Sequence, residues 1–169
     1  MFKRISISMA LIVFMSGLSF SADEFTLMRE ERIGGLSIGM PEQELKQKLK
    51  KEINCVLKRG PERLWGADGL YHQKWEYAGC GLVIGMVSEK RGAPKSIDSI
   101  AVVGPGGYAT KRGIRIGSTK QEVMKAYKEN WNKEESGEGG FTAGSIYGGL
   151  IFDFKKGRVS RIFLGAGAE

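Results

Sequence analysis

Residues 35–45 read GLSIGMPEQEL, and 78 positions later residues 113–123 read GIRIGSTKQEV. Five of the eleven positions are identical, namely both glycines, the isoleucine, the glutamine and the glutamate. In each copy an apolar residue precedes a glycine, which permits a sharp backbone turn, and a run with helical character begins directly afterwards. The two stretches therefore predict that the chain contains two copies of one small module.

Each stretch is predicted to open a short amphipathic helix. Pro41 stands at the start of the first helix, where its missing N–H would be unpaired in any residue. Thr119 and Glu122 have the spacing of a capping box at the start of the second. Apolar residues then recur at every fourth position, at Leu45, Leu49 and Ile53 in the first copy and at Val123, Tyr127 and Trp131 in the second. Such stripes indicate helices that pack one face against another layer, and Trp131 is accordingly expected in the core.

Strand-like runs follow each helix. Alternating or continuous apolar character predicts strands over residues 71–77, 81–87 and 97–103, and over residues 145–147, 149–154 and 159–164. Residues 155–158, read KKGR, are predicted to form the hairpin turn between the last two strands. The sequence therefore predicts an α+β fold. It is a tandem duplication of a helix (or helix–loop–helix) plus three-stranded antiparallel β module, with the helices packed on one face of the sheet.

The first 21 residues are typical of a secretory signal peptide. Lys3 and Arg4 precede an apolar run that is shorter than the about 20 residues of a membrane span. Small residues predict cleavage after Ser21, with Ala22 as the alternative. We therefore expect a periplasmic or secreted protein with no membrane span or lipid anchor in its mature form. The expected parts of that form are an N-terminal extension (22–34), the first repeat (35–103), an inter-repeat turn (104–112) and the second repeat (113–169).

The charge of the chain indicates the kind of partner. The net charge is +7, and removal of Lys3 and Arg4 leaves 24 basic against 19 acidic residues, or +5. Basic residues are not interleaved with aromatic ones as in a nucleic-acid interface, and an exported protein seldom meets nucleic acid. A basic surface is compatible with nucleic acid, anionic lipid or an acidic protein partner, and also with a solvated surface that has a basic bias and no charged partner. We expect a protein partner, for which the charge suggests an acidic surface, and no nucleic-acid partner.

Two cysteines, Cys55 and Cys80, are predicted to form one disulfide, because exported proteins fold in an oxidising compartment. A metal-binding pair is the alternative. That alternative is weak, because zinc needs three or four ligands and His72 is the only histidine.

The doubled motif resembles the fold family of the β-lactamase inhibitory protein and the small BamE (SmpA/OmlA) outer-membrane assembly proteins. The inhibitor is itself a tandem repeat, with an Asn-Cys pair after its first helix and a partner cysteine near the start of its sheet. Asn54, Cys55 and Cys80 stand in matching places. The resemblance implies a tandem fold with a protein-binding role. The chain departs from the inhibitor in having no cysteines in the second copy, and from the assembly proteins in lacking a lipid-bearing cysteine.

No pattern in the sequence points to catalysis. A single histidine, His72, excludes most Ser–His and Cys–His arrangements. Glu44 and Glu122 recur in the two copies, but capping and the helix dipole explain a glutamate in a first helical turn. We therefore predict a protein that is not an enzyme, with no catalytic residue, no metal site and no cofactor. Glu, Asp and His72 converging in one cleft would favour an enzyme instead.

Aromatic residues crowd the first copy. Tyr71, Trp75 and Tyr77 would share one side of a strand, which lies either in the core under the helices or on an exposed sheet face. Trp65 lies in a glycine-containing loop and is expected to be exposed. If the aromatic side is exposed, the candidate protein contacts are Trp65, Tyr71, Trp75, Tyr77 and Tyr147, since tryptophan and tyrosine dominate interface hot spots.

These observations together predict an exported protein-binding module. It would be inhibitor-like or immunity-like, or an accessory of envelope assembly. The alternative is a protein that binds a small ligand or an envelope polymer through an aromatic sheet face.

Overall fold

The computed structural model describes residues 25–50, 55–104 and 106–167. The predicted signal peptide, its cleavage site, Ile53 and Asn54 lie outside these ranges. The described chain is α+β, with helices α1 (Thr26–Glu30), α2 (Glu42–Leu49) and α3 (Lys120–Ala126) and the 3-10 turn η1 (Lys128–Asn130). No helix in these ranges has the length and apolar character needed to cross a membrane.

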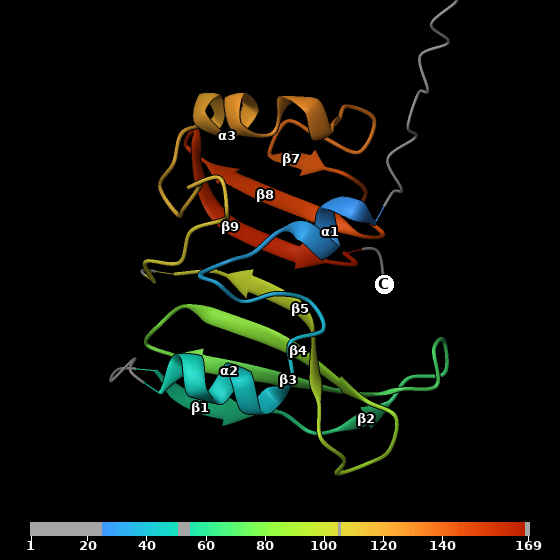
Figure 1. Cartoon of the computed structure of the whole chain (residues 1–169). Coiled ribbons are helices and arrows are strands. Elements are labelled where there is room, and N and C mark those ends of the chain that lie inside the picture. Colours follow the sequence, from blue (N-terminus) through green and yellow to red (C-terminus); the bar gives the residue numbers. More distant parts are fainter. Residues whose placement is uncertain (1–24, 51–54, 105, 168–169) are drawn as a thin grey trace, which may run out of the picture.

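Nine strands form one antiparallel sheet (Figure 1). They are β1 (Val56–Arg59), β2 (Arg63–Leu64), β3 (Tyr71–Ala78), β4 (Leu82–Ser88), β5 (Ser96–Val102), β6 (Trp131–Asn132), β7 (Gly140–Ala143), β8 (Gly149–Lys155) and β9 (Arg158–Gly165). Their order is β1-β3-β4-β5-β9-β8-β7-β6, and β2 also pairs with β3. The pairing of β5 with β9 therefore joins the strands of the two predicted repeats into a single sheet.

One face of the sheet carries the hydrophobic core, and we call it the core face. A single cross-strand row on this face runs through Trp75, Ile84, Ile100, Leu164 and Leu150. None of these residues is more than 2% exposed. Buried residues of all three helices, including Leu27, Leu45, Leu49 and Val123, belong to the same apolar cluster. Successive residues of a strand point to opposite faces, so the neighbours of this row lie on what we call the second face.

The two longer helices begin as the sequence predicts. Pro41 caps α2 in an extended conformation (φ −63°, ψ 148°) and leaves the helical hydrogen bonds intact. At α3 the capping box is complete. The Thr119 N–H donates to Glu122 Oε2 (2.6 Å), and the Glu122 N–H donates to Thr119 Oγ1 (3.2 Å).

The glycine before each helix fastens it to the sheet in the same way. The Gly39 N–H donates to the Ile97 carbonyl (2.7 Å), and the Gly117 N–H donates to the Val159 carbonyl (2.8 Å). Both glycines have positive φ, +78° and +88°, which side-chain-bearing residues rarely adopt. Each helix start is thus held against the last long strand of its own half of the chain, β5 or β9.

Two expectations about the second half are wrong, and three short strands were missed. Residues 145–147 are not a strand. The Gly148 N–H donates to the Ser145 carbonyl (3.1 Å) in a tight turn, and the strand lies earlier, at β7. Trp131 does not continue the α3 stripe, because α3 ends at Ala126 and Trp131 begins β6 with 36% exposure. The short strands β1, β2 and β6 were not predicted, since four residues or fewer carry little periodic signal.

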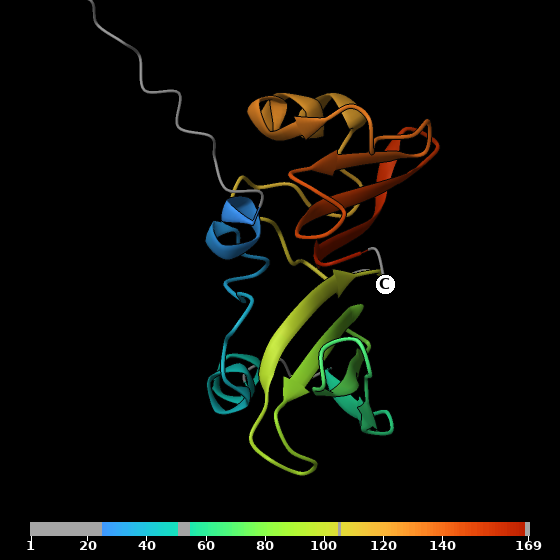
Figure 2. The same cartoon turned by 90° about the vertical axis from the view of Figure 1, so that its right-hand side faces the viewer.

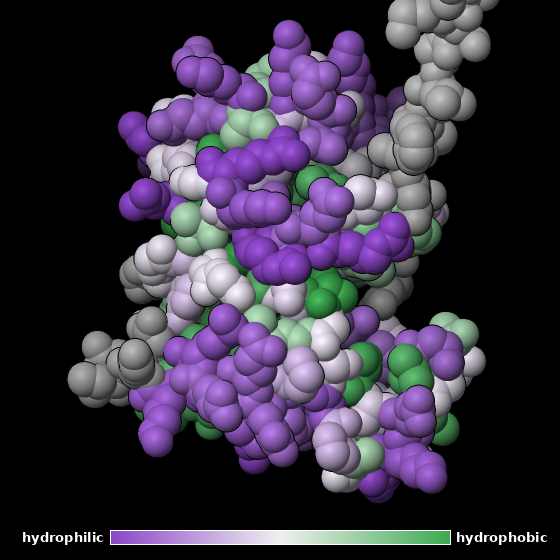
Figure 3. All heavy atoms as spheres, viewed as in Figure 1, coloured by the Kyte–Doolittle hydropathy of each residue, from purple (hydrophilic) through white to green (hydrophobic). Residues whose placement is uncertain are grey.

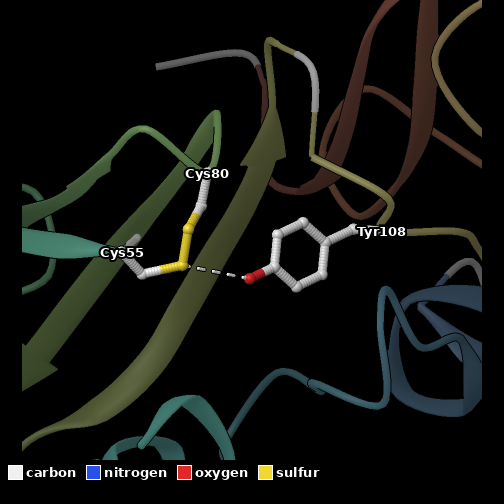
Figure 4. Close-up of a disulfide and its surroundings, with 3 residues drawn as sticks. All are labelled: Cys55, Cys80 and Tyr108. Atoms are coloured by element: carbon white, nitrogen blue, oxygen red, sulfur yellow. Dashed lines mark hydrogen bonds between the residues drawn. A yellow bond between two sulfur atoms is a disulfide. The ribbon is translucent and has the colours of Figure 1, made fainter. Parts of the chain in front are cut away.

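The predicted disulfide is confirmed. Cys55 and Cys80 are bonded, with a Cα–Cα distance of 5.3 Å, and they join the start of β1 to the turn between β3 and β4. Tyr108, from the segment between the two halves, places its hydroxyl 3.6 Å from Cys55 Sγ (Figure 4). The tyrosine ring packs directly on Gly34, where a Cβ atom would collide with it. The disulfide therefore fixes the edge of the first half against which Tyr108 packs.

Candidate functional site on the second face of the sheet

The second face carries a row of half-buried apolar side chains that crosses both halves of the chain. In register order the row contains Val83 on β4, Ala101 on β5, Phe163 on β9 and Ile151 on β8. Val83, Phe163 and Ile151 each remain partly exposed, whereas the corresponding positions of the core face are sealed. The second face is therefore apolar along its centre and partly exposed, with Gly167 lying beside Ile151 and Phe163.

Charged residues beside this row are paired with one another. Lys74 Nζ lies 3.4 Å from Glu76 Oε2, and Arg161 NH1 lies 3.1 Å from Asp153 Oδ2. The Arg161 guanidinium also lies 5.0 Å from the centroid of the Phe163 ring. Such exposed pairs add little to stability, but they set a mixed charge pattern around the apolar row.

The connection between β1 and β3 folds onto the second face at His72. β2 places Arg63 opposite His72, and the Trp65 ring stacks on the His72 ring with centroids 3.8 Å apart and planes 9° apart. Two backbone hydrogen bonds close the loop after Trp65. The Trp65 N–H donates to the Leu70 carbonyl (2.9 Å), and the Gly69 N–H donates to the Trp65 carbonyl (3.0 Å). In the side view, this teal-to-green connection lies to the right of the strands and α1 and α2 lie to the left (Figure 2).

His72 lies between two aspartates. Its Nε2 is 2.7 Å from Asp68 Oδ2, and its Nδ1 is 3.9 Å from Asp98 Oδ2. Asp98 is the extra residue of a β-bulge, because Gly85 faces Ser99 while Met86 faces Ile97. The bulge turns the Asp98 carboxylate toward the histidine.

The two carboxylates differ in their environment. The Leu70 N–H and the His72 ring hold the pKa of Asp68 below its usual range. Burial raises the pKa of Asp98, although the charge of His72 acts in the opposite direction. Asp98 is therefore a partly desolvated carboxylate, and among the described residues no hydrogen-bond donor is recorded on it.

The cluster of Asp68, His72 and Asp98 places an imidazole between two carboxylates, beside the Trp65 ring. Both nitrogens of His72 face carboxylates, and no hydroxyl–imidazole hydrogen bond of the kind used in nucleophilic catalysis joins it to Ser99 within the described chain. Over the same ranges, no group of three or more His, Cys, Asp or Glu side chains is arranged to hold a metal ion.

A hollow of about 440 Å³ lies beside this cluster, and we call it the Trp65 slot. Trp65 and His72 line it from one side, Gly85 and Asp98 line it from the strands, and Arg63 lies at its edge. A hollow of this volume is large enough for one bulky side chain or a small ligand.

The predicted contact residues are spread over both sides of the sheet. Trp75 and Tyr77 are 2% and 4% exposed, so burial selects the core alternative and removes them from any contact surface. Trp75 donates from Nε1 to Gln73 Oε1 (2.8 Å), with the Arg59 guanidinium 4.7 Å from its ring centroid.

The other three candidates lie apart. Tyr71 is half-buried at the end of the same side, with Arg91 5.8 Å from its ring. Tyr147 is 57% exposed in the turn between β7 and β8. Trp65 alone of the five lies on the second face next to a hollow.

Sequence reasoning missed Phe163 and Ile151. The signal was present, because residues 149–154 and 159–164 are apolar on both alternating sides, which predicts a strand with no fully polar face. What the alternation does not reveal is that β5 and β9 pair, which places Phe163 beside Ala101 and continues the row to Ile151 on β8.

A further hollow, of about 670 Å³, lies on the core side between α1, η1 and β6. Its charged lining includes Glu30, Glu129 and Arg112. Arg112 is already engaged, because its NH1 donates to the Ala126 carbonyl (2.7 Å) and its guanidinium lies over the Tyr127 ring.

Comparison of the chain with known protein families, with curated proteins and with solved structures found no match. The resemblance to the β-lactamase inhibitory protein and BamE family therefore rests on the doubled motif and on the sequence positions of Asn54, Cys55 and Cys80.

Proposed function

We propose that this chain is an exported protein-binding module that contacts its partner through the second face of the sheet. The module would be a tandem duplication whose helices cover the core face and leave the second face free. In this proposal the protein binds and does not catalyse.

Equivalent backbone geometry supports the duplication. In both halves the turn before the helix exchanges hydrogen bonds with the start of the last long strand, through Gly39 and Ile97 and through Gly117 and Val159. In both halves the middle strand also carries a register shift, after Gly85 and after Asp153. The recurrence of both features at equivalent places favours a duplication.

Burial supports the division of the sheet into a covered and a free face. Side chains of α1, α2 and α3 join the cluster on the core face. The side of the molecule that carries α1 and α2 presents a mostly hydrophilic surface to solvent (Figure 3). A polar outer layer is typical of helices that cover a core with their apolar face.

The observation that carries the proposal is the apolar row of Val83, Ala101, Phe163 and Ile151. Its members come from four adjacent strands of both halves, and three of them keep partial exposure. A partly exposed apolar row rimmed by charged residues has the arrangement of a protein–protein interface, with an apolar centre and a polar rim. The disulfide supports export, because such bonds persist in oxidising compartments.

The charge of the protein bears on which kind of protein partner it binds. The predicted mature net charge of +5 favours an acidic partner, with an inhibitor-like or immunity-like role or a role in envelope assembly. On the second face itself Lys74 and Arg161 are matched by Glu76 and Asp153, so the excess positive charge lies elsewhere on the surface. Contact with an acidic partner would then speed association more than it would raise affinity.

Site-specific photocrosslinking in the envelope of the source cells tests the proposal. A photoreactive phenylalanine analogue would replace Phe163 or Lys74 on the second face. Matched control positions are Lys48 on α2 and Lys125 on α3, which are exposed on the helices. We expect one protein adduct from both second-face positions and none from the controls. Adducts from the helix positions alone, or from no position, would refute the proposal.

The Trp65 slot is the observation that favours the alternative, a binder of a small ligand or envelope polymer. The two functions differ in the size of the crosslinked product. A protein partner gives a discrete heavier band when the crosslinker stands at Phe163. A small ligand gives no such band, because it covers only the residues that line the slot.

A further inference from the structure

The Trp65 slot has flat walls. The stacked rings of Trp65 and His72 form one side of it, and their planes are 9° apart. Asp68 accepts a hydrogen bond from the Leu70 N–H (2.9 Å), and its Oδ2 lies 2.7 Å from His72 Nε2. These two contacts hold the His72 ring in place. The wall is thus a pre-formed aromatic surface, held by hydrogen bonds within the loop.

The strand side of the slot is formed by small residues. Gly85 faces Ser99 at the bulge, and the Ser99 hydroxyl occupies the place that a Cβ atom of Gly85 would take. The sheet next to the Trp65 wall therefore presents a glycine and a serine, with no bulky side chain. Val83 continues this surface toward the apolar row of the second face.

The charges that line the slot are of both signs. Arg63 and Lys74 are basic and Asp98 is acidic, and Lys74 is already paired with Glu76. An ionic occupant of either sign would therefore meet a like charge as well as an opposite one. A neutral group that carries a hydrogen-bond donor fits these three residues best. Its donor can bond to the Asp98 carboxylate, and the group adds no charge to the slot.

We propose that the Trp65 slot receives one aromatic side chain of the protein partner that carries a hydrogen-bond donor, a tyrosine or a tryptophan, whose O–H or N–H is accepted by Asp98. The inference rests on the proposed function. It adds the identity of the anchor residue that a partner must present.

The ring of such an anchor would pack beside Trp65 and over Gly85. Offset or edge-to-face packing on Trp65 favours a flat ring over a branched aliphatic side chain. The hollow of about 440 Å³ holds one ring with part of its backbone. A tyrosine or tryptophan anchor in a pocket is also the commonest form of hot spot in protein interfaces.

Titration with blocked single amino acids tests this directly on the mature protein. The probes are N-acetyl amides of tyrosine, tryptophan, phenylalanine, leucine and lysine, followed by nuclear magnetic resonance at the Trp65 indole N–H. We expect tyrosine and tryptophan amides to bind with dissociation constants on the order of 1 mM, as fits ligands of this size. Phenylalanine amide should bind about three- to tenfold more weakly, because it lacks one hydrogen bond. Leucine and lysine amides should not saturate.

Three variants assign the contacts. Trp65→Ala should weaken tyrosine amide at least about tenfold. Asp98→Ala should remove the preference for tyrosine over phenylalanine, and Asp98→Asn, which keeps an acceptor, should restore part of it. Trp131→Ala is the matched control, since Trp131 is exposed on β6 in the other half. It should leave all affinities unchanged.

Each contrary result removes a defined part of the proposal. Equal binding of phenylalanine and tyrosine amides would overturn the role of Asp98, and equal binding of leucine or lysine amide would overturn the aromatic anchor. No probe-dependent shift at Trp65 would overturn the slot altogether. If the probes bind as expected while crosslinking from Phe163 finds no protein, the proposed function fails and the slot remains as a small-ligand site.

Discussion

Replacement of Tyr127 by phenylalanine should destabilise the protein through a buried carboxylate. Glu31 is 2% exposed and accepts hydrogen bonds from the Arg32 N–H (2.9 Å), the Lys111 N–H (2.8 Å) and the Tyr127 hydroxyl (2.9 Å). These donors lie next to α1, in the segment between the halves and at the end of α3. Glu31 therefore ties three distant parts of the chain together in the interior.

The magnitude follows from what remains after the hydroxyl is removed. Both backbone donors, Arg32 and Lys111, act on Oε1, so Oε2 loses the Tyr127 hydroxyl, the one donor recorded for it in the described chain. A hydrogen bond to a buried charged acceptor contributes about 1.5–3 kcal/mol, and we expect a loss of about 2 kcal/mol. The phenylalanine ring keeps the packing of Tyr127 against Phe152, whose centroid lies 5.3 Å away, so little of the loss comes from the core.

Equilibrium urea unfolding measures this loss. With a slope of about 2 kcal/mol per molar urea, the midpoint of Tyr127→Phe should fall by about 1 M without a change of slope. Tyr147→Phe is the matched control, because Tyr147 is 57% exposed, and its midpoint should not move. In a Glu31→Gln background the effect of Tyr127→Phe should shrink by about 1 kcal/mol, because the acceptor is then neutral. A Tyr127→Phe midpoint equal to that of Tyr147→Phe would refute the reasoning.

Three further outcomes are expected. Trp75→Ala should lower the free energy of unfolding by about 3–5 kcal/mol, whereas the exposed Trp131→Ala should lower it by less than about 1 kcal/mol; similar values in urea unfolding would contradict the burial argument. Reduction of the Cys55–Cys80 bond, which spans 25 residues, should lower stability by about 3 kcal/mol, and thiol labelling before reduction should find no reactive cysteine in the native protein. Asp98→Asn should stabilise the fold at pH 7, because burial raises the pKa of Asp98 and so disfavours its charged form in the folded state. That gain should vanish below about pH 4, where Asp98 is protonated both folded and unfolded; a loss of stability at pH 7 would give the opposite sign.

The local features were predictable because their causes lie within a few residues. The helix starts at Pro41 and Thr119 follow from capping chemistry that spans one helical turn. The long strands β3, β4, β5, β8 and β9 follow from alternation within seven or eight residues. The disulfide follows from the count of two cysteines and an expected oxidising compartment.

The choice between alternatives depended on partners far away in the sequence. Trp75 and Tyr77 were equally compatible with a core and with an exposed face, and packing against α2 placed them in the core. Trp131 fitted the α3 stripe by spacing, but the chain leaves the helix at Ala126 and pairs Trp131 with Ala143. Spacing alone does not reveal where a helix stops when no glycine or proline marks its end.

By itself, therefore, the sequence determined the α+β class, the helix starts and the long strands, since each depends on short-range chemistry. It also determined the disulfide, because the chain has only two cysteines. The tertiary structure decided what the second face is. Strand pairing set Phe163 beside Ala101, and the β-bulge turned Asp98 toward His72 under the Trp65 ring. These contacts join residues separated by tens of positions, and register and loop closure, which create them, are properties of the folded sheet as a whole.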